Sequence, residues 1–183
     1  MITRVSGSDF SDDFTRLVNE RSGAILRYAL RRINDPWVCE DIVEDTFLVA
    51  WRHRDSIPGR SEELTWLYSI AFRVLSNHRR SRDRKRRLDT RLIAEHVNNS
   101  NADTDTVDAR SLLIELGTLK EIDRKILEFV YWESLSYREI GQILGLSENA
   151  VGMRLHKAKQ RLRTQLEISE QRASESAIPK DVE

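Results

Sequence analysis

Side chains between Ser147 and Arg163 could hydrogen-bond to the bases and phosphates of a nucleic acid. When the segment is projected as a helix at about 100° per residue, its apolar side carries Val151, Leu155, Ala158 and Leu162. The opposite side carries Asn149, Met153, His156 and Gln160, and the shoulders carry Arg154, Lys157, Lys159, Arg161 and Arg163. Groups at the outward tip suit base edges, and cations beside them suit the flanking phosphates. The pattern favours a helix that reads duplex DNA, although periodicity alone would also fit a solvated basic face on an ordinary helical hairpin.

The residues in front of this helix predict a helix-turn-helix. Ser136 and Glu139 have the spacing of a capping box at the start of a short helix. Gly145-Leu146-Ser147 predicts a tight turn, in which Ser147 caps a longer basic helix that runs to about Glu167. A short helix, a glycine-containing turn and a longer basic helix together form the DNA-binding pattern. A further capping box is predicted from Thr118 to Glu121, beside a buried face of Leu119, Ile122, Ile126, Phe129 and Val130.

A second set of candidate residues lies on a helix predicted from Pro36 to about Arg54, with Asp35 as its N-cap. Its inward stripe is Cys39, Ile42, Val43, Thr46, Phe47 and Ala50. Its outward face is Asp41, Glu44, Asp45, Leu48 and Arg52, with Trp51 at the edge. Large apolar groups rimmed by charge suggest a protein partner. The alternative is that Leu48 and Trp51 pack under the N-terminal segment.

A third predicted helix, capped by Ser61, combines aromatic and basic residues. Its apolar stripe is Leu64, Leu67, Ile70, Ala71, Val74 and Leu75, and it ends in the basic run 79–87. Cations that follow a backbone, with rings that stack on bases, suit single-stranded nucleic acid. Trp66 and Phe72 could equally belong to the core, and an arginine-rich helix end could simply be solvated.

These elements indicate an all-α protein made of two small helical domains. A first helix is predicted over about 12–33, and the turn signals at Pro58-Gly59 separate the next two helices. The segment 95–108 is polar and mildly acidic and has no period, which is typical of a flexible linker. We therefore predict a first domain over 10–92, a linker over 93–108, a second domain over 109–168 and a disordered tail over 169–183.

Composition excludes several classes of function. The 183 residues have a net charge of zero, which argues against a uniformly basic nucleic-acid binder, and the single cysteine, Cys39, allows no intrachain disulfide. No apolar run approaches the roughly 20 residues that span a bilayer, so we expect a soluble, cytoplasmic protein without membrane insertion. The four histidines have no metal-ligand spacing and no phosphate-binding glycine loop is present. An enzyme, a metal site and a cofactor are therefore not expected.

Three segments resemble the conserved motifs of bacterial sigma factors, in the order in which that family has them. Residues 41–52 (DIVEDTFLVAWR) look like the helix that binds core RNA polymerase. Residues 65–71 (TWLYSIA), with Asn77 and Arg79-Arg80, resemble the helix that melts and reads the minus-ten element. Residues 135–147 (LSYREIGQILGLS) and 151–158 (VGMRLHKA) resemble the helix-turn-helix that reads the minus-thirty-five element.

The resemblance implies three groups of functional residues. Docking on the clamp of the polymerase largest subunit would use Asp41, Glu44, Asp45, Leu48, Trp51 and Arg52. Capture of the minus-ten element would use the loop 53–60 and the third helix, through Arg54, Ile57, Arg60, Trp66, Arg73, Asn77, Arg79 and Arg80. Binding of minus-thirty-five DNA would use Tyr137, Arg138, Ser147, Asn149, Met153, Arg154, His156, Lys157 and Arg161. The second domain would also contact the flap of the second-largest subunit.

The length points to the minimal extracytoplasmic-function class, because 183 residues leave no room for the extra regions of housekeeping sigma factors. The class implies an anti-sigma factor as a further partner. The chain departs from the family pattern at Lys120, Arg73 and Gly152-Met153, and the last two departures concern promoter preference. Two alternatives stay open: a helix-turn-helix regulator that replaces no polymerase subunit, and an interaction protein that sequesters another factor.

Overall fold

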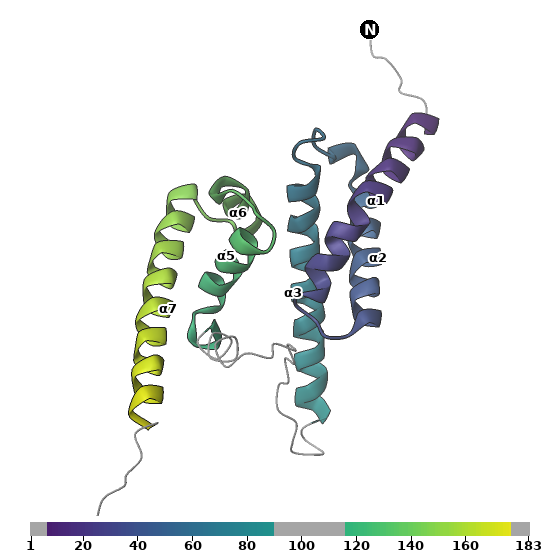
Figure 1. Ribbon diagram of the computed structural model, residues 1–183. Coiled ribbons are helices and arrows are strands. Elements are labelled where there is room, and N and C mark those ends of the chain that lie inside the picture. Colours follow the sequence, from purple (N-terminus) through teal and green to yellow (C-terminus); the bar gives the residue numbers. More distant parts are fainter. Residues whose placement is uncertain (1–6, 90–115, 177–183) are drawn as a thin grey trace, which may run out of the picture. The chain divides into compact units, whose positions relative to one another are not determined.

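The computed structural model describes residues 7–89 and 116–176, and the regular structure in these two ranges is entirely helical (Figure 1). The chain divides into two compact units, residues 1–101 and 102–183. The boundary between them falls inside the segment 93–108, which was predicted as a linker and lies outside the described residues. The all-α class predicted from the sequence is therefore confirmed. No helix in the described ranges is long and apolar enough to cross a bilayer.

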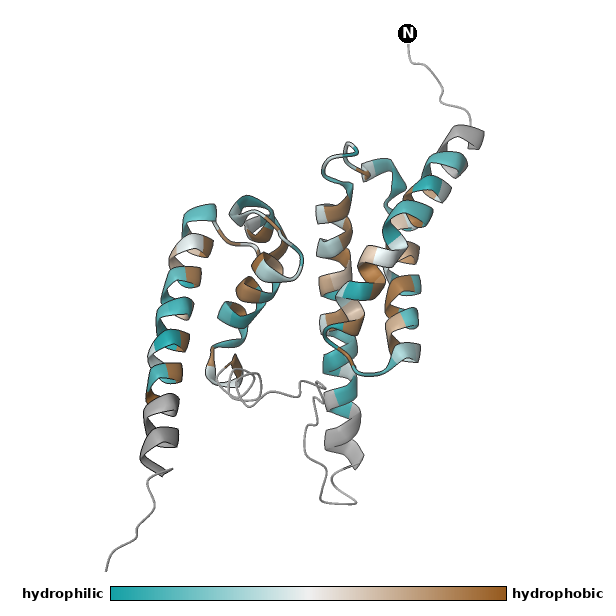
Figure 2. Cartoon of the chain, in the orientation of Figure 1, coloured by the Kyte–Doolittle hydropathy of each residue, from teal (hydrophilic) through white to brown (hydrophobic). Residues whose placement is uncertain are grey.

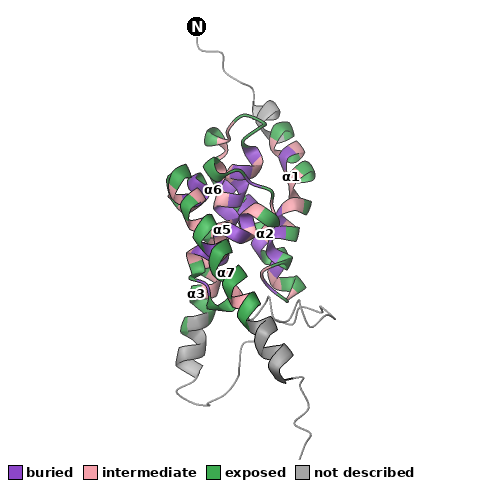
Figure 3. Cartoon of the chain, turned by 60° about the vertical axis from the view of Figure 1, so that its left-hand side comes forward, coloured by how far each residue is buried: buried purple, intermediate pink, exposed green. Residues whose placement is uncertain are grey.

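The first unit is a bundle of three helices: α1 (Gly7–Leu30), α2 (Pro36–Arg52) and α3 (Glu63–Asp89), with a short 3-10 helix, η1 (Arg54–Ser56), after α2. Each helix packs against the other two, and their apolar faces turn toward one another (Figures 2 and 3). The largest fully buried side chains of this unit include Leu17, Ile25, Tyr28, Ile42 and Leu67. Cys39 is also fully buried, and its thiol lies 3.6 Å from the carbonyl oxygen of Ile33.

The start of α2 is determined by the residues that precede it. Asp35 has extended backbone angles, and its Oδ1 accepts hydrogen bonds from the backbone N–H groups of Trp37 and Val38 at 3.1 and 3.4 Å. Pro36 occupies the first helical position, where its missing N–H costs nothing. The predicted cap is thus confirmed, while the helix ends at Arg52, slightly before the predicted Arg54.

The start of α3 differs from the prediction. Ser61 was expected to cap this helix, but the backbone N–H of Glu62 still closes a turn onto the carbonyl of Gly59, and α3 begins only at Glu63. The first carbonyl of the helical ladder is that of Glu62, which accepts from the N–H of Trp66 at 3.0 Å. Ser61 therefore lies outside the capping position.

A buried ion pair holds this end of α3 against α1. Glu63 is only 2% exposed, and its carboxylate accepts hydrogen bonds from Arg16 at 2.7 Å and from Arg21 at 3.5 Å. The hydrogen bond from Arg16 holds the pKa of the Glu63 carboxyl below its usual value, against the opposing effect of burial. The pair joins positions 47 residues apart, so no local pattern in the sequence indicates it.

The second unit comprises α5 (Glu121–Tyr131), α6 (Tyr137–Leu144) and α7 (Glu148–Ser176), and both shorter helices pack on α7. Its core includes Ile126, Phe129, Ile140, Val151 and Leu155. The apolar side predicted for the last helix is buried at Val151, Leu155 and Ala158, with Leu162 half-buried.

One of the two predicted capping boxes forms. The backbone N–H of Ser136 donates to Glu139 Oε2 at 2.8 Å, and the N–H of Glu139 donates to Ser136 Oγ at 3.3 Å. The box predicted at Thr118 is wrong, because Lys120 occupies the N-cap and α5 begins directly at Glu121. The hydroxyl of Thr118 instead donates to Gln165 on α7 at 2.9 Å.

The last helix is longer than predicted. It continues to Ser176, past the expected end at Glu167 and into the segment 169–183 that was predicted to be disordered. That prediction is wrong for 169–176, while 177–183 lie outside the described residues. No glycine or proline occurs in the sequence between Gly152 and Pro179, and Arg163 pairs with Glu167 one turn later at 3.0 Å.

Candidate partner and nucleic-acid interfaces

The six residues predicted to bind a protein partner lie together on the outer side of α2. Leu48 is 45% exposed and Trp51 is 41% exposed. The exposed charged residues around them are Asp41, Glu44, Asp45 and Arg52. The inward stripe of the same helix is buried, apart from the half-buried Val43. We call these six residues the α2 face.

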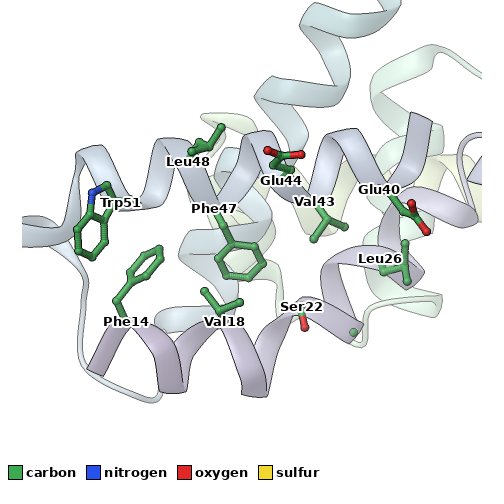
Figure 4. Close-up of a pocket in the computed structure, with 11 residues that line it drawn as sticks. Phe14, Val18, Ser22, Leu26, Glu40, Val43, Glu44, Phe47, Leu48 and Trp51 are labelled. Carbon is green, nitrogen blue, oxygen red and sulfur yellow. The ribbon is translucent and has the colours of Figure 1, made fainter. Parts of the chain in front are cut away.

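An apolar groove of about 500 Å³ runs beside the α2 face, between α1 and α2 (Figure 4). Its lining includes Phe14, Val18, Leu26, Val43, Phe47, Leu48 and Trp51, with Glu40 and Glu44 among them. Trp51 meets Phe14 edge to face, with ring centroids 4.9 Å apart. Trp51 thus packs against the N-terminal helix, as the alternative interpretation proposed, and still exposes two fifths of its surface.

The loop after α2 carries two of the arginines assigned to single-stranded DNA. Arg54 places its guanidinium 5.1 Å from the centre of the Trp51 ring and donates to the Trp51 carbonyl at 3.3 Å. Arg60 pairs with Glu20 of α1 at 2.6 Å, although both side chains remain open to solvent. Ile57, between these arginines, is half-buried.

The residues assigned to the third helix are divided between two faces of α3. Trp66, Arg73, Asn77 and Arg80 recur at spacings of seven, four and three residues, so they share one face. Arg73, Asn77 and Arg80 are exposed and Trp66 is half-buried. Arg79 points elsewhere and donates to the carbonyl of Arg32 at 3.2 Å. Tyr68 is buried against Tyr28, with ring centroids 5.4 Å apart, which leaves its ring unavailable as a stacking platform.

A close backbone contact determines the geometry of the helix-turn-helix. Gly145 ends α6 with φ 70° and ψ 35°, a left-handed conformation that favours glycine. The N–H of Leu146 then returns to the carbonyl of Gly141 at 2.9 Å. A Cβ at Gly141 would lie 2.5 Å from the carbonyl oxygen of Leu146, so this position has no space for a side chain. Ser147 accepts from the N–H of Ala150 at 3.2 Å, which confirms the predicted cap of α7.

The outer side of α7 presents most of the residues assigned to duplex DNA. Asn149, Met153, His156, Lys157 and Arg161 are all exposed. Arg154 is instead engaged within the protein, because it donates to the nearly buried Asp123 of α5 at 2.9 Å. Sequence reasoning missed this pair, whose members stand 31 residues apart.

The start of α6 and the turn supply the other three residues of this set. Tyr137 is 41% exposed, and its ring lies over Gly152, about 3.5 Å from where a Cβ would be. Arg138 is exposed. Ser147 is exposed as well, and its hydroxyl oxygen serves the cap of α7. Within the described ranges, no three His, Cys, Asp or Glu side chains cluster as a metal site would require.

Two family models match the chain, one on each unit. Sigma-70 region 2 matches residues 17–85, and Sigma-70, region 4 matches residues 110–162. The RNA polymerase sigma factor YlaC of Bacillus subtilis is 32% identical over 158 residues, covering 83% of this chain and 91% of the relative. The ECF RNA polymerase sigma factor SigL of Mycobacterium tuberculosis is 29% identical over 171 residues, covering 91% of this chain and 97% of the relative.

Solved structures share the fold. The sigma factor RpoE of Bartonella quintana, in complex with the anti-sigma factor NepR, aligns with a TM-score of 0.63 at 23% identity, covering 85% of this chain and 98% of that one. CnrH, in complex with the cytosolic domain of CnrY, aligns with a TM-score of 0.56 at 25% identity, covering 86% of this chain and 90% of CnrH.

One alternative was a helix-turn-helix regulator that replaces no polymerase subunit. The match to region 2 does not favour it, because such a regulator would account for the second unit and leave the first unexplained. Both regions occur in one chain, in the order that the sequence motifs predicted. The relatives match nearly their full length. The chain therefore belongs to the RNA polymerase sigma factors, in their extracytoplasmic-function class.

Proposed function

We propose that this sigma factor uses three separate surfaces to direct core RNA polymerase to its promoters. The α2 face binds the polymerase, the loop 53–60 with one face of α3 captures the minus-ten element, and the outer side of α7 binds the minus-thirty-five duplex. The observation that carries the proposal is the exposure of Leu48 and Trp51 among the acids of α2, since helices that face only solvent rarely expose such a pair.

The α2 face has the composition of a binding site for another protein. Interface cores are enriched in aromatic and large apolar residues, with polar residues at the rim. Leu48 and Trp51 would form that core, while Asp41, Glu44 and Asp45 would select a basic partner segment and speed the encounter. We assign this partner to the clamp of the polymerase largest subunit.

The proposed minus-ten site combines a ring with cations. Extruding a base costs a few kcal/mol, which stacking and phosphate contacts would offset. Trp66 lies on the same face of α3 as Arg73, Asn77 and Arg80, so a strand that passes the ring also passes the cations. Arg60 can exchange its exposed pair with Glu20 for a phosphate, because exposed ion pairs contribute little stability. We expect Arg79 to contribute less to DNA binding, since its guanidinium already donates to the backbone carbonyl of Arg32.

The proposed minus-thirty-five site is the N-terminal half of α7. Asn149, Met153 and His156 would face base edges, and Lys157 and Arg161 would face phosphates. Tyr137 and Arg138, at the start of α6, would contact the backbone beside the groove. Arg154 would act indirectly, because its bond to Asp123 fixes α7 against α5. The flap of the second-largest polymerase subunit would contact the same unit.

Further parts of the proposal concern chemistry and location. The sigma factor would supply binding and strand separation without a cofactor, while the polymerase catalyses nucleotide addition. It would work in the cytoplasm, where the polymerase and the promoter are.

An anti-sigma factor is a candidate for the groove between α1 and α2, since Leu48 and Trp51 belong both to the groove and to the α2 face. A segment bound there would compete directly with the polymerase.

The docking assignment is tested by Leu48→Arg. A cation within the acidic, apolar face should abolish co-purification with core polymerase and promoter-dependent transcription in vitro. Leu30→Arg is the matched control, because Leu30 is 44% exposed on α1 and lies outside the face. Both variants should keep their helical circular dichroism, and the control should keep polymerase binding. Polymerase binding by folded Leu48→Arg protein at the level of the control would refute the assignment.

A further inference from the structure

Met153 is an exposed apolar side chain at the position where α7 would meet base edges. It is 55% exposed, and Ile168, about four turns later, is the other exposed large apolar residue in the part of α7 whose side chains are described. Asn149 stands one turn before it and His156 one turn after it, and both are exposed on the same side of the helix. Met153 therefore lies at the centre of the outward face.

The two residues next to Met153 in the sequence place no long polar side chain on the outward face. Gly152 has no side chain, and the ring of Tyr137 lies over it. Arg154, on the other side, is turned away to Asp123 at 2.9 Å. The thioether of Met153 is therefore an apolar group on an outward face whose other side chains, one turn away, are the polar Asn149, His156 and Lys157.

Thymine is the unmodified base whose major-groove edge matches an exposed apolar side chain. Guanine, cytosine and adenine present hydrogen-bonding groups there, whereas thymine adds a C5-methyl group. A thioether placed against the polar edges would remove water from them without replacing the lost hydrogen bonds. Placed against the methyl group, it would bury apolar area from both partners.

We propose that Met153 contacts the C5-methyl group of a thymine in the minus-thirty-five element and thereby selects that base. The inference rests on the proposed entry of α7 into the major groove. Asn149, one turn nearer the start of the helix, would read a neighbouring base pair, where its amide geometry suits adenine. The element would thus include a thymine recognised without any hydrogen bond to its edge.

Replacement of thymine by uracil removes this methyl group and changes nothing else on the base edge. Holoenzyme binding would be measured on promoters in which each minus-thirty-five thymine, on either strand, is replaced in turn. Burial of about one methyl group corresponds to roughly a fourfold change in affinity. We expect such a loss at one position for the unaltered protein and for Met153→Leu, and equal binding of thymine and uracil for Met153→Ala.

Lys157→Ala provides the control, because loss of a phosphate contact should weaken binding to thymine and uracil promoters by the same factor. Equal binding of thymine and uracil at every position, with normal dependence on the minus-thirty-five sequence, would overturn the inference and leave the proposed function intact. A uracil penalty that persists in Met153→Ala would also overturn it. Binding that ignores the minus-thirty-five sequence altogether would instead contradict the proposed function of α7.

Discussion

The carboxylate of Glu63 stabilises the first unit by linking two of its helices. It is buried at the first position of α3, where the positive end of the helix dipole favours it, and it accepts hydrogen bonds from Arg16 and Arg21 of α1. Because the pKa of this carboxyl is lowered in the folded protein, its contribution is complete above its unfolded pKa of 4.5. The contribution is lost as the pH falls below that value, through the folded pKa.

Glu63→Gln should therefore lower the free energy of unfolding at neutral pH by roughly 1–3 kcal/mol, since it removes the buried charged acceptor that the half-buried Arg16 and Arg21 share. The difference between the variant and the unaltered protein should shrink as the pH falls below about 4.5. Urea denaturation at a series of pH values measures this. Glu167→Gln is the control, because its exposed pair with Arg163 should contribute less than about 1 kcal/mol. A difference that does not change with pH would contradict the assignment.

Among the elements, the helix-turn-helix depends on the approach of two backbone segments. The absence of a side chain at Gly141 lets the carbonyl of Leu146 pass within 2.5 Å of where a Cβ would be. This contact fixes how closely α6 approaches the start of α7. The position of the proposed reading residues on α7 therefore depends on a residue that contacts no DNA.

Gly141→Val should reduce the free energy of unfolding of the second unit by about 1–3 kcal/mol, because the backbone of the turn must move to accept the side chain. Thermal unfolding of the full chain, followed by circular dichroism, would reveal the loss. Gly117→Val is the comparison, since a Cβ at Gly117 meets nothing within 4 Å. If the two variants were equally stable, the turn would not be limited by this contact.

Element boundaries were predictable where the determining residues are close together in the sequence. Asp35, Ser136 with Glu139, and Ser147 each cap a helix through groups two to three residues away. Thr118 has the same local pattern and failed, because its hydroxyl bonds to Gln165 of a distant helix. The pairs of Glu63 with Arg16 and of Asp123 with Arg154 could not be predicted either, since only the folded chain brings them together.

The candidate site was predicted more completely on α2 than on the other helices. Periodicity separated the exposed α2 face from the buried stripe, because one side of that helix packs and the other does not. On α3 and α7, periodicity could not show that Arg79 and Arg154 are engaged within the protein. The net charge of zero likewise concealed an acidic α2 face and basic residues on α3 and α7.

At the scale of the whole molecule, the two units should separate on proteolysis. Brief digestion should cut first within 93–108 and release two folded fragments, because residues in packed helices resist cleavage. A protease of broad specificity is needed, since trypsin would favour the arginine-rich end of α3. Mass spectrometry would locate the cuts. One protected fragment that spans 93–108 would show that this segment is not an open linker.

The burial of Cys39 has a consequence for how the protein could respond to oxidants. Burial raises the pKa of this thiol, and the thiolate is the form that oxidants attack. Cys39 is also the only cysteine in the chain, so no second sulfur is available to form an internal disulfide. A promoter response to disulfide stress would therefore have to reach this sigma factor through another redox-active molecule, because its own thiol is shielded inside the bundle.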